Sequence, residues 1–412
     1  MSDDDLLYIA ERRYGAMAEP SAVALRRADR RRHFYAVGES GTGKSTLLER
    51  MFIQDMVAGE GVGLIDPHGT AANRLLDFIP PWRTQELLYF NVADQAHPVP
   101  FNPLSGYPLE KRHLAVDGII TACRSFWADS WGARLEYLLA NAVAAAMELP
   151  DGTFLTIKRM LNDPGYRKRV AMRLIDPGVR NFWNVEFVSD YQGKFRSEAL
   201  SPLQNKIGRF LMTSLMRNIF GQANDQIDAR FKMDRQRIVI ANLAKGAIGE
   251  SNANLIGAFL ITAFELAANA RLAAPECDDA PVQADYPDFY LYVDEFQNFG
   301  TSSFKRILAE ARKMRLSLAL FNQYAAQLTT DMQQALIGTV GTIAAFRVGS
   351  NDAAILSRQF AGAITERDLV DLDSYELVVR LEQMIPTPRL TNPRRRCRSA
   401  LAGGYLLSAS DH

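Results

Sequence analysis

The residues best suited to chemistry form a glycine-rich run near the start of the chain. The run reads Gly-x-x-x-x-Gly-Lys-Ser, follows an apolar stretch at residues 34–37 and precedes a helix-forming stretch at residues 46–52. A strand, a glycine-rich turn and a helix start form the context in which such a run cradles phosphates. A Gly/Ser-rich turn could match the letters by chance, but the flanking strand and helix make that alternative weak. The predicted nucleotide-binding residues are Gly38, Glu39, Ser40, Gly41, Thr42, Gly43, Lys44, Ser45 and Thr46.

Each residue type in this run has a chemical reason. Gly38, Gly41 and Gly43 let the backbone adopt positive φ and bring successive N–H groups close to a polyphosphate. The helix start that follows adds unpaired donors and a partial positive charge. Lys44 can reach the β- and γ-phosphates, and Ser45 can place its hydroxyl on Mg²⁺. We therefore expect ATP and Mg²⁺ as the cofactors of this site.

A second pair of reactive groups, Asp294 and Glu295, lies far along the chain. The pair directly follows a stretch of β-favouring residues at 289–293. Asp294 is expected to hold Mg²⁺ through water, and Glu295 to polarise the hydrolytic water as a general base. An Asp-Glu pair after a strand is weak evidence alone. Together with an intact phosphate-binding loop it indicates an ATPase site.

Polar residues also follow two other predicted strands. Asp66 ends an apolar run at residues 61–65, and ligands of open α/β sheets bind at that edge. It could contact the Mg²⁺ shell or the attacking water, or could cap the turn that follows. Asn322 and Gln323 end another run, and an amide there could sense the γ-phosphate. A turn cap is the alternative, and it fits Asn322 better than Gln323.

These groups need a scaffold that brings distant strand ends together. Apolar runs and helix-forming segments over residues 33–108 and 235–390 predict an α/β fold with a mostly parallel central sheet. Between them, residues 109–234 show apolar residues at helical spacing, turn signals and no clear strand, which predicts an all-helical insertion. We expect residues 1–32 to form a helical lead-in and residues 391–412 to form a basic tail.

Two groups of basic residues are candidates for contact with nucleic acid. Those of the insertion alternate with the exposed-looking Tyr166, Trp183, Tyr191 and Phe195, a pattern that can track a nucleic-acid backbone and stack bases. The pattern is also common on any helical surface. The arginines of the lead-in serve either a solvated face or a phosphate-backbone or subunit contact. The basic residues are Arg167, Lys168, Arg169, Arg173, Lys194, Arg196, Lys206 and Arg209 in the insertion, and Arg26, Arg27, Arg30, Arg31 and Arg32 in the lead-in.

Composition bounds the class of protein. The composition, 48% hydrophobic and 23% charged, is ordinary for a globular protein. A chain of 412 residues exceeds the size at which a single hydrophobic core usually stops growing. Its formal net charge is zero, so any nucleic-acid site must be a local patch. Its 3 cysteines are far apart, which argues for a reducing compartment. The acidic N-terminus and the interrupted apolar stretch at residues 255–270 predict a cytoplasmic protein with no transmembrane segment of its own.

Taken in order, these motifs resemble those of the HerA/FtsK superfamily of RecA-like motor ATPases. Within it, the chain is similar to the soluble motor portion of type IV secretion (conjugative) coupling proteins. The Asp-Pro-His-Gly segment and the pairing of Arg-Lys with Asn-Gln are far more specific than the glycine-rich run alone. The matching segments, which together span roughly residues 30–385, are residues 38–45, 64–69, 291–296, 310–313, 322–323 and 346–347.

The resemblance implies more than the spacing does. It implies a RecA-like P-loop NTPase that forms a homo-oligomer, usually a hexameric ring, with nucleotide at the subunit interfaces and DNA in the central channel. Arg312 matches the arginine finger that acts on the neighbouring subunit's nucleotide, and Gln323 matches the polar sensor. The helical insertion matches the domain that faces the incoming DNA. Coupling proteins typically begin with membrane-spanning helices, which this chain does not show, so a membrane or secretion-system partner is a further expectation.

Three functions remain as hypotheses. The first is an ATP-hydrolysing ring motor that translocates DNA. The second is a type IV secretion-like ATPase that energises protein export. The third is an ATP-dependent oligomeric switch without translocation, which the Asp294–Glu295 pair disfavours because a switch needs no hydrolytic base. The zero net charge adds little support for DNA, although a ring motor needs only a lined pore.

Overall fold

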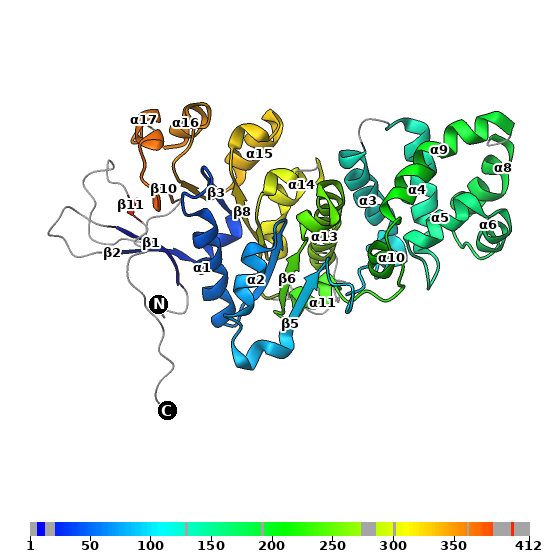
Figure 1. Cartoon of the computed structure of the whole chain (residues 1–412), viewed down its shortest axis with the longest axis horizontal. Coiled ribbons are helices and arrows are strands. Elements are labelled where there is room, and N and C mark those ends of the chain that lie inside the picture. Colours follow the sequence, from blue (N-terminus) through cyan, green and yellow to red (C-terminus); the bar gives the residue numbers. More distant parts are fainter. Residues whose placement is uncertain are drawn as a thin grey trace, which may run out of the picture.

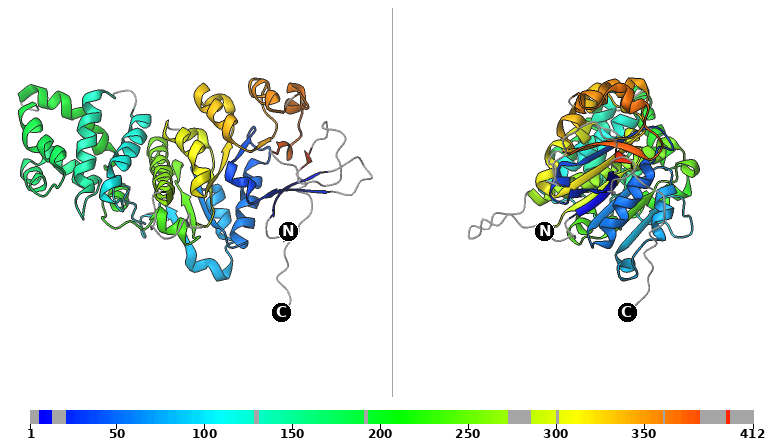
Figure 2. Two further views of the ribbon diagram at one scale, coloured as in Figure 1. Left: turned by 180° about the vertical axis from the view of Figure 1, so that it is seen from behind. Right: turned by 90° about the vertical axis from the view of Figure 1, so that its left-hand side faces the viewer.

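One large sheet organises the chain, and a lobe of helices stands at one end of it (Figure 1). The computed structural model describes residues 6–12, 21–127, 131–190, 193–272, 286–299, 302–360, 362–381 and 397–398. The helical lobe and the N-terminal strands lie at opposite ends of the longest axis, and the view from behind in Figure 2 shows the same arrangement. The sheet therefore sits between two additions of different kinds.

The sheet has 11 strands in the order β2-β1-β11-β10-β9-β3-β8-β7-β4-β6-β5. Neighbouring strands from β9 to β5 are all parallel, whereas β10 runs antiparallel to β9. Their carboxyl ends therefore meet at one edge. The bounds are β1 Leu6–Arg12, β2 Ser21–Arg26, β3 Phe34–Val37, β4 Gly61–Asp66, β5 Leu87–Asn91, β6 Ile238–Asn242, β7 Phe289–Val293, β8 Leu316–Asn322, β9 Thr342–Ala345, β10 Glu376–Arg380 and β11 Cys397–Arg398.

The central strands are mostly apolar because helices cover both faces of the sheet. Every residue of β3, β4, β6, β7 and β8 is buried. Phe34 and Ala36 of β3 belong to one core cluster with residues of α1 (Lys44–Val57) and α2 (Thr70–Leu76). Tyr35 and Val37 belong to the other, with residues of α13 (Glu250–Leu272) and α14 (Ser302–Glu310). The remaining helices of the sheet domain are α12 Lys245–Ile248, α15 Thr330–Thr339, α16 Ser350–Ser357 and α17 Glu366–Val370.

The described part of residues 109–234 contains helices and no strand, as the helical spacing predicts. This lobe packs closely on the sheet domain, because a Cβ at Gly118 of α3 would lie 2.7 Å from Cγ2 of Thr262 in α13. The helices are α3 Arg112–Phe126, α4 Ala133–Met147, α5 Phe154–Asn162, α6 Pro164–Ala171, α7 Pro177–Asn181, α8 Phe187–Asp190, α9 Gly193–Phe210, α10 Ser214–Phe220 and α11 Ala229–Asp234.

The helix expected over residues 1–32 is wrong. The described residues there form β1 and β2, an antiparallel pair at the edge of the sheet, and a short 3-10 helix at Asp29–Arg32. Leu7 and Ile9 are buried, whereas Tyr8 between them is 42% exposed, so burial follows the period of two that a strand shows. A short apolar stretch fits a helix or a strand, and here the pairing of β1 with β11 favours the strand.

The predicted basic tail is described only in part. Cys397–Arg398 form β11, which pairs antiparallel with both β1 and β10 and so joins the N-terminal strands to the main sheet. Residues 391–396 and 399–412, which hold most of the predicted basic cluster, lie outside the described residues.

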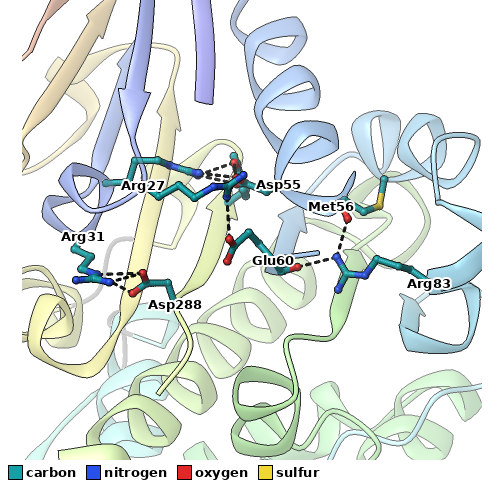
Figure 3. A network of polar contacts seen from close by, with 9 residues as sticks. Arg27, Arg31, Asp55, Met56, Glu60, Arg83 and Asp288 are labelled. Carbon is teal, nitrogen blue, oxygen red and sulfur yellow. Dashed lines mark hydrogen bonds and ion pairs between the residues drawn. The ribbon is translucent and has the colours of Figure 1, made fainter. Parts of the chain in front are cut away.

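Three of the arginines before β3 form ion pairs within the chain, and for the buried Arg30 neither interpretation given for that cluster holds. Arg30 is 3% exposed and donates to both carboxylate oxygens of Asp55 at 2.6 and 2.7 Å. Arg27 also donates to Asp55, at 3.1 Å, and Arg31 donates to Asp288 at 2.9 Å (Figure 3). Since Asp55 lies on α1 and Asp288 directly precedes β7, the cluster fastens the N-terminal segment to the sheet domain.

Helix α13 contains the most apolar stretch of the chain. By length and composition it could cross a membrane, but 78% of its apolar window is buried inside the protein. It packs between the sheet and α3 of the helical lobe. The prediction that this stretch is a buried helix is confirmed.

Candidate active site

Residues 38–43 connect β3 to α1 at the carboxyl edge of the sheet. Gly41 and Gly43 adopt φ of 78° and 114°, which glycine reaches without strain. Gly38 does not have positive φ, so the expectation for this glycine is wrong. Glycine is required there for space instead, because a Cβ would lie 2.5 Å from Cβ of Phe346.

The side chain of Lys44 folds back over the loop that precedes it. Its ammonium group donates to the carbonyl oxygen of Gly38 and, at 2.7 Å, to that of Glu39. Burial lowers the pKa of Lys44 to about 8, although Asp294, Glu295 and Glu39 act in the opposite direction. Among the described residues its hydrogen-bond partners are these two neutral carbonyls, and a phosphate would supply an anionic one.

Asp294 and Glu295 follow β7, which is separated from β3 by β8 alone. The backbone N–H of Asp294 donates to the carbonyl of Ile65 at 3.0 Å, which fixes the pair against β4. The pKa of Asp294 is raised to about 7, chiefly by burial and also by the nearby carboxylates Asp66 and Glu295, while Lys44 acts in the opposite direction. Three carboxylates thus face one lysine at this edge, which is a setting suited to a cation.

The carboxylate of Glu295 is held by donors from three chain segments. Gln323 Nε2 donates to Oε1 at 2.8 Å, and Asn298 Nδ2 donates to Oε2 at 2.9 Å. Nε2 of His68 lies 3.0 Å from the same Oε2. The backbone of Glu295 has φ of 45°, a strained value for a residue with a side chain. These contacts orient the carboxylate and sustain that strain.

Asp66 acts as a cap in this structure. Its side chain is buried and accepts hydrogen bonds from the backbone N–H groups of His68 and Ala72, both at 2.9 Å. The cap holds the turn that carries His68 and the first turn of α2. Asp66 also lines the cavity described below, beside Asp294. The capping alternative therefore describes its contacts, and its charge acts on the pKa of Asp294.

The two amides after β8 differ in their surroundings. Gln323 reaches Glu295, as described above, rather than closing a turn. Asn322 is 1% exposed, and its side-chain amide faces the buried phenol of Tyr35 rather than the backbone of a turn. Its backbone carbonyl accepts from the N–H of Gly38 at 3.3 Å. Asn322 thus fastens β8 to the start of the glycine-rich loop.

These residues line one cavity of about 370 Å³. The wall includes most of the predicted site, whereas Gly38, Glu39 and Thr42 are not part of it. Within the described residues, no group of three or more His, Cys, Asp or Glu side chains could hold a metal. Mg²⁺ at Ser45 and Asp294 would therefore take its other oxygen ligands from phosphate and water, which is its usual habit. The lining residues are Ser40, Gly41, Gly43, Lys44, Ser45, Thr46, Glu49, Asp66, His68, Thr70, Ala71, Arg74, Asp294, Glu295, Phe321, Asn322, Gln323 and Tyr375.

Arg312 does not belong to this cavity. It lies in a short 3-10 helix, Ala311–Met314, just before the amino end of β8, and its side chain is outside the described part. Strand β8 is 7 residues long. At a rise of about 3.3 Å per residue it separates Arg312 from the cavity edge by roughly 20 Å, which no side chain spans.

The basic residues predicted on the helical lobe divide into buried and exposed ones. Arg167 is 8% exposed and donates to the carbonyl of Met160 at 2.7 Å, so it is a structural residue. Trp183, expected to be exposed, is buried, and its indole N–H donates to the carbonyl of Asn141. That expectation is wrong because the large ring fills the core of the lobe. The exposed basic side chains are Lys168, Arg169, Arg173 and Arg209, whereas Lys206 is half-buried and the side chains of residues 191–199 are not described.

Several wall residues are not predicted from the sequence, namely His68, Tyr375, Glu49, Thr70, Ala71, Arg74 and Phe321. His68 belongs to the Asp-Pro-His-Gly segment, which the sequence analysis singled out. That motif alone does not predict that His68 contacts Glu295. Tyr375 lies in the turn before β10, and nothing in the local sequence distinguishes it. Both come from segments far from the residues that they approach.

Comparisons with known proteins now extend this description. No protein-family model matches the sequence, and no curated protein matches it at a significant level. The structure is similar to that of plasmid coupling protein TrwB in complex with the non-hydrolysable GTP analogue GDPNP, with a TM-score of 0.65, 13% identity, and coverage of 97% of this chain and 95% of that one. For the TrwB complex with ADP and Mg²⁺ the TM-score is 0.63 at 13% identity, with 92% of this chain and 93% of that one covered. For VirB4 of Thermoanaerobacter pseudethanolicus the TM-score is 0.60 at 13% identity, with 98% of each chain covered.

At such low sequence identities, these similarities are evidence for a shared fold alone. The predicted α/β class, a RecA-like P-loop NTPase fold with a mostly parallel sheet, is confirmed. The resemblance to type IV secretion coupling proteins is likewise confirmed at the level of the fold, over nearly the whole length of this chain.

Proposed function

We propose that the protein binds ATP with Mg²⁺ and hydrolyses it. One observation carries this proposal: Lys44, Asp294 and Glu295, from distant parts of the chain, line a single cavity beside a glycine-rich loop. A lysine with a buried ammonium and a pair of strand-end carboxylates are the groups that ATP hydrolysis requires. TrwB, which shares the fold, has been solved with an ATP analogue and with ADP and Mg²⁺.

The loop and Lys44 bind the phosphates in this mechanism. Backbone N–H groups at the start of α1 and the Lys44 ammonium offset the charge of the β- and γ-phosphates. Ser45 and Asp294 are the residues that would hold Mg²⁺, which when bound neutralises charge that develops on the phosphate oxygens. The raised pKa of Asp294 favours such a partner, since a nearby cation stabilises the carboxylate.

Glu295 performs the proton transfer. Its carboxylate accepts a proton from the water that attacks the γ-phosphorus, while the bond to the β–γ bridging oxygen breaks and ADP leaves with that electron pair. Gln323 and Asn298 each donate to one carboxylate oxygen and so aim the base. Gln323 therefore positions Glu295. Through this contact Gln323 can respond to a bound γ-phosphate.

Movement of DNA by a homo-oligomeric ring, with a hexamer as the expected size, is our proposal for what the hydrolysis drives. Two features support it: Arg312 lies at the end of β8 opposite the cavity of its own chain, and the helical lobe presents the exposed basic residues Lys168, Arg169 and Arg173. The similarity to TrwB, described as a bacterial conjugative coupling protein, points the same way. We place the protein in the cytoplasm, where it would work with a membrane or secretion-system partner.

Energising protein export is the second candidate. It is favoured by the similarity to VirB4, which covers 98% of both chains. An oligomeric switch is less consistent with a base as firmly oriented as Glu295. DNA dependence separates the candidates, because phosphate contacts release counterions and weaken steeply with salt.

The test is phosphate release by the purified full chain with ATP and Mg²⁺, with and without DNA oligonucleotides, at two salt concentrations. Mg²⁺-dependent hydrolysis is expected, with a stimulation by DNA that falls at the higher salt. Replacing Lys168, Arg169 and Arg173 together by alanine should reduce the stimulation and leave the basal rate unchanged. Hydrolysis without any DNA effect would favour protein export. No hydrolysis under any condition would contradict the ATPase proposal.

A further inference from the structure

Tyr375 lines the cavity but has no role in the proposed hydrolysis. It lies in the turn between α17 and β10, and its side chain is 42% exposed. Its ring packs on the glycine-rich loop, because a Cβ at Gly43 would lie 2.9 Å from Cδ1 of Tyr375. Its backbone N–H donates to the carbonyl of Thr42 at 2.8 Å. An aromatic side chain is therefore fixed beside the phosphate-binding loop with much of its surface uncovered.

The strand order puts Tyr375 and the acidic residues on opposite sides of the loop. Asp294 and Glu295 follow β7, two positions to one side of β3, whereas Tyr375 precedes β10, two positions to the other side. Because β10 runs antiparallel to β9, its first residue lies at the same edge as the carboxyl ends of the parallel strands. At about 4.8 Å per strand, β7 and β10 lie roughly 19 Å apart across this edge.

This arrangement fixes the direction of a bound nucleotide. The γ-phosphate belongs beside Glu295 and Lys44, where the reacting groups are. The rest of the molecule then extends away from β7, past the start of α1, toward the side on which Tyr375 stands. Phe321, another aromatic residue of the wall, is fully buried and offers no free ring face.

We propose that the ring of Tyr375 is the platform on which the nucleobase stacks. The inference rests on the proposed nucleotide site and names the part of the ligand that this side of the site recognises. Every base has a π face, so stacking contributes affinity without selecting adenine. The platform therefore accepts purine nucleotides as a class, GDP as well as ADP.

The backbone geometry makes the ring testable on its own. The hydrogen bond to Thr42 comes from the main chain, so a substitution at Tyr375 keeps it. The residue has φ of 65°, a value that asparagine tolerates better than most residues. Tyr375→Asn and Tyr375→Ala thus remove the ring in two ways, and Tyr375→Phe keeps it. Tyr8→Ala on β1 is a matched control, since Tyr8 is also 42% exposed.

The experiment is calorimetric titration of the full chain with ADP, GDP and inorganic tripolyphosphate. We expect both ring-removing variants to bind ADP and GDP about tenfold to a hundredfold more weakly, the scale of one base–aromatic stack. Tripolyphosphate, which has no base, should bind them within about twofold of the wild type. Tyr375→Phe and Tyr8→Ala should match the wild type for all three ligands.

Two results would overturn the platform. The first is unchanged binding of ADP and GDP when the ring is removed. The second is an equal loss for tripolyphosphate, which would show that the ring only supports the loop. A wild type that binds neither tripolyphosphate nor ADP would instead reject the nucleotide site itself, so the two failures are distinguishable.

Discussion

The side-chain amide of Gln323 donates to Oε1 of Glu295 at 2.8 Å, although the two residues end different strands. The adjacency of β8 and β7 makes this contact possible, because parallel neighbours end at the same edge. Gln323 thus orients the base proposed for hydrolysis, and it is also the residue that a γ-phosphate would approach.

Removing that amide should slow the chemical step without weakening binding. In Gln323→Ala, Glu295 keeps its donor Asn298 but loses the one on Oε1. We expect kcat to fall by about tenfold to a hundredfold, as when a supporting partner of a reactive group is lost. The ATP dissociation constant should stay within about twofold. A raised dissociation constant with unchanged kcat would show that Gln323 binds nucleotide rather than positions the base.

The binding of ADP should depend on pH through Lys44. Burial lowers its pKa to about 8, so the ammonium is present below that pH and is progressively lost above it. Since phosphate prefers the charged form, ADP without Mg²⁺ should bind about tenfold more weakly at pH 9.5 than at pH 7. Lys44→Arg stays charged in this range and should show a flat profile. A flat profile for the wild type would contradict the assignment of Lys44 to the phosphates.

Asp294 should destabilise the nucleotide-free protein above neutral pH. Its pKa is raised to about 7 in the folded state, so the folded chain binds more protons than the unfolded chain between about pH 4 and 7. Stability therefore falls as pH rises through this window. Asp294→Asn should raise Tm at pH 8, where the carboxylate is charged, and change it little at pH 5, where it is neutral. Thermal unfolding at both values checks this, and an equal Tm change at pH 5 and pH 8 would refute it.

Arg312 should act between subunits. It precedes the amino end of β8, whereas the cavity lies at the carboxyl end. We expect Arg312→Ala to lose about 10³-fold in turnover, the scale of an arginine finger, while still binding ATP. Mixing it with Lys44→Ala should restore part of the activity, because some interfaces then combine an intact loop with an intact arginine. Without any rescue, a role in trans would be excluded.

The sequence predicts the parts of this site whose signal is local. The glycine-rich run, the Asp294–Glu295 pair and the parallel sheet follow from residue types within short stretches, and the structure brings the run and the pair to one cavity. Arg30 could not be interpreted in this way. Its burial depends on Asp55, which the fold alone brings near.

The same limit explains the other errors. Residues 6–12 have an apolar pattern too short to distinguish a strand from a helix, and a pairing partner from the far end of the chain decides between them. The neighbouring basic residues suggest an exposed Trp183, yet its ring packs on Phe182 and Phe187 and its indole donates to Asn141 of α4. Tyr375 reaches the cavity through topology rather than through any nearby motif, and His68 meets Glu295 only because the fold brings their segments together.

The central claim is that Glu295 is the base for hydrolysis of ATP bound at Lys44. The most direct test follows bound ATP in a single turnover by Glu295→Gln, which keeps the shape of the side chain and removes its basicity. We predict ATP affinity within about threefold of the wild type and conversion to ADP slowed by about 10² to 10⁴. Conversion at the wild-type rate would contradict the account.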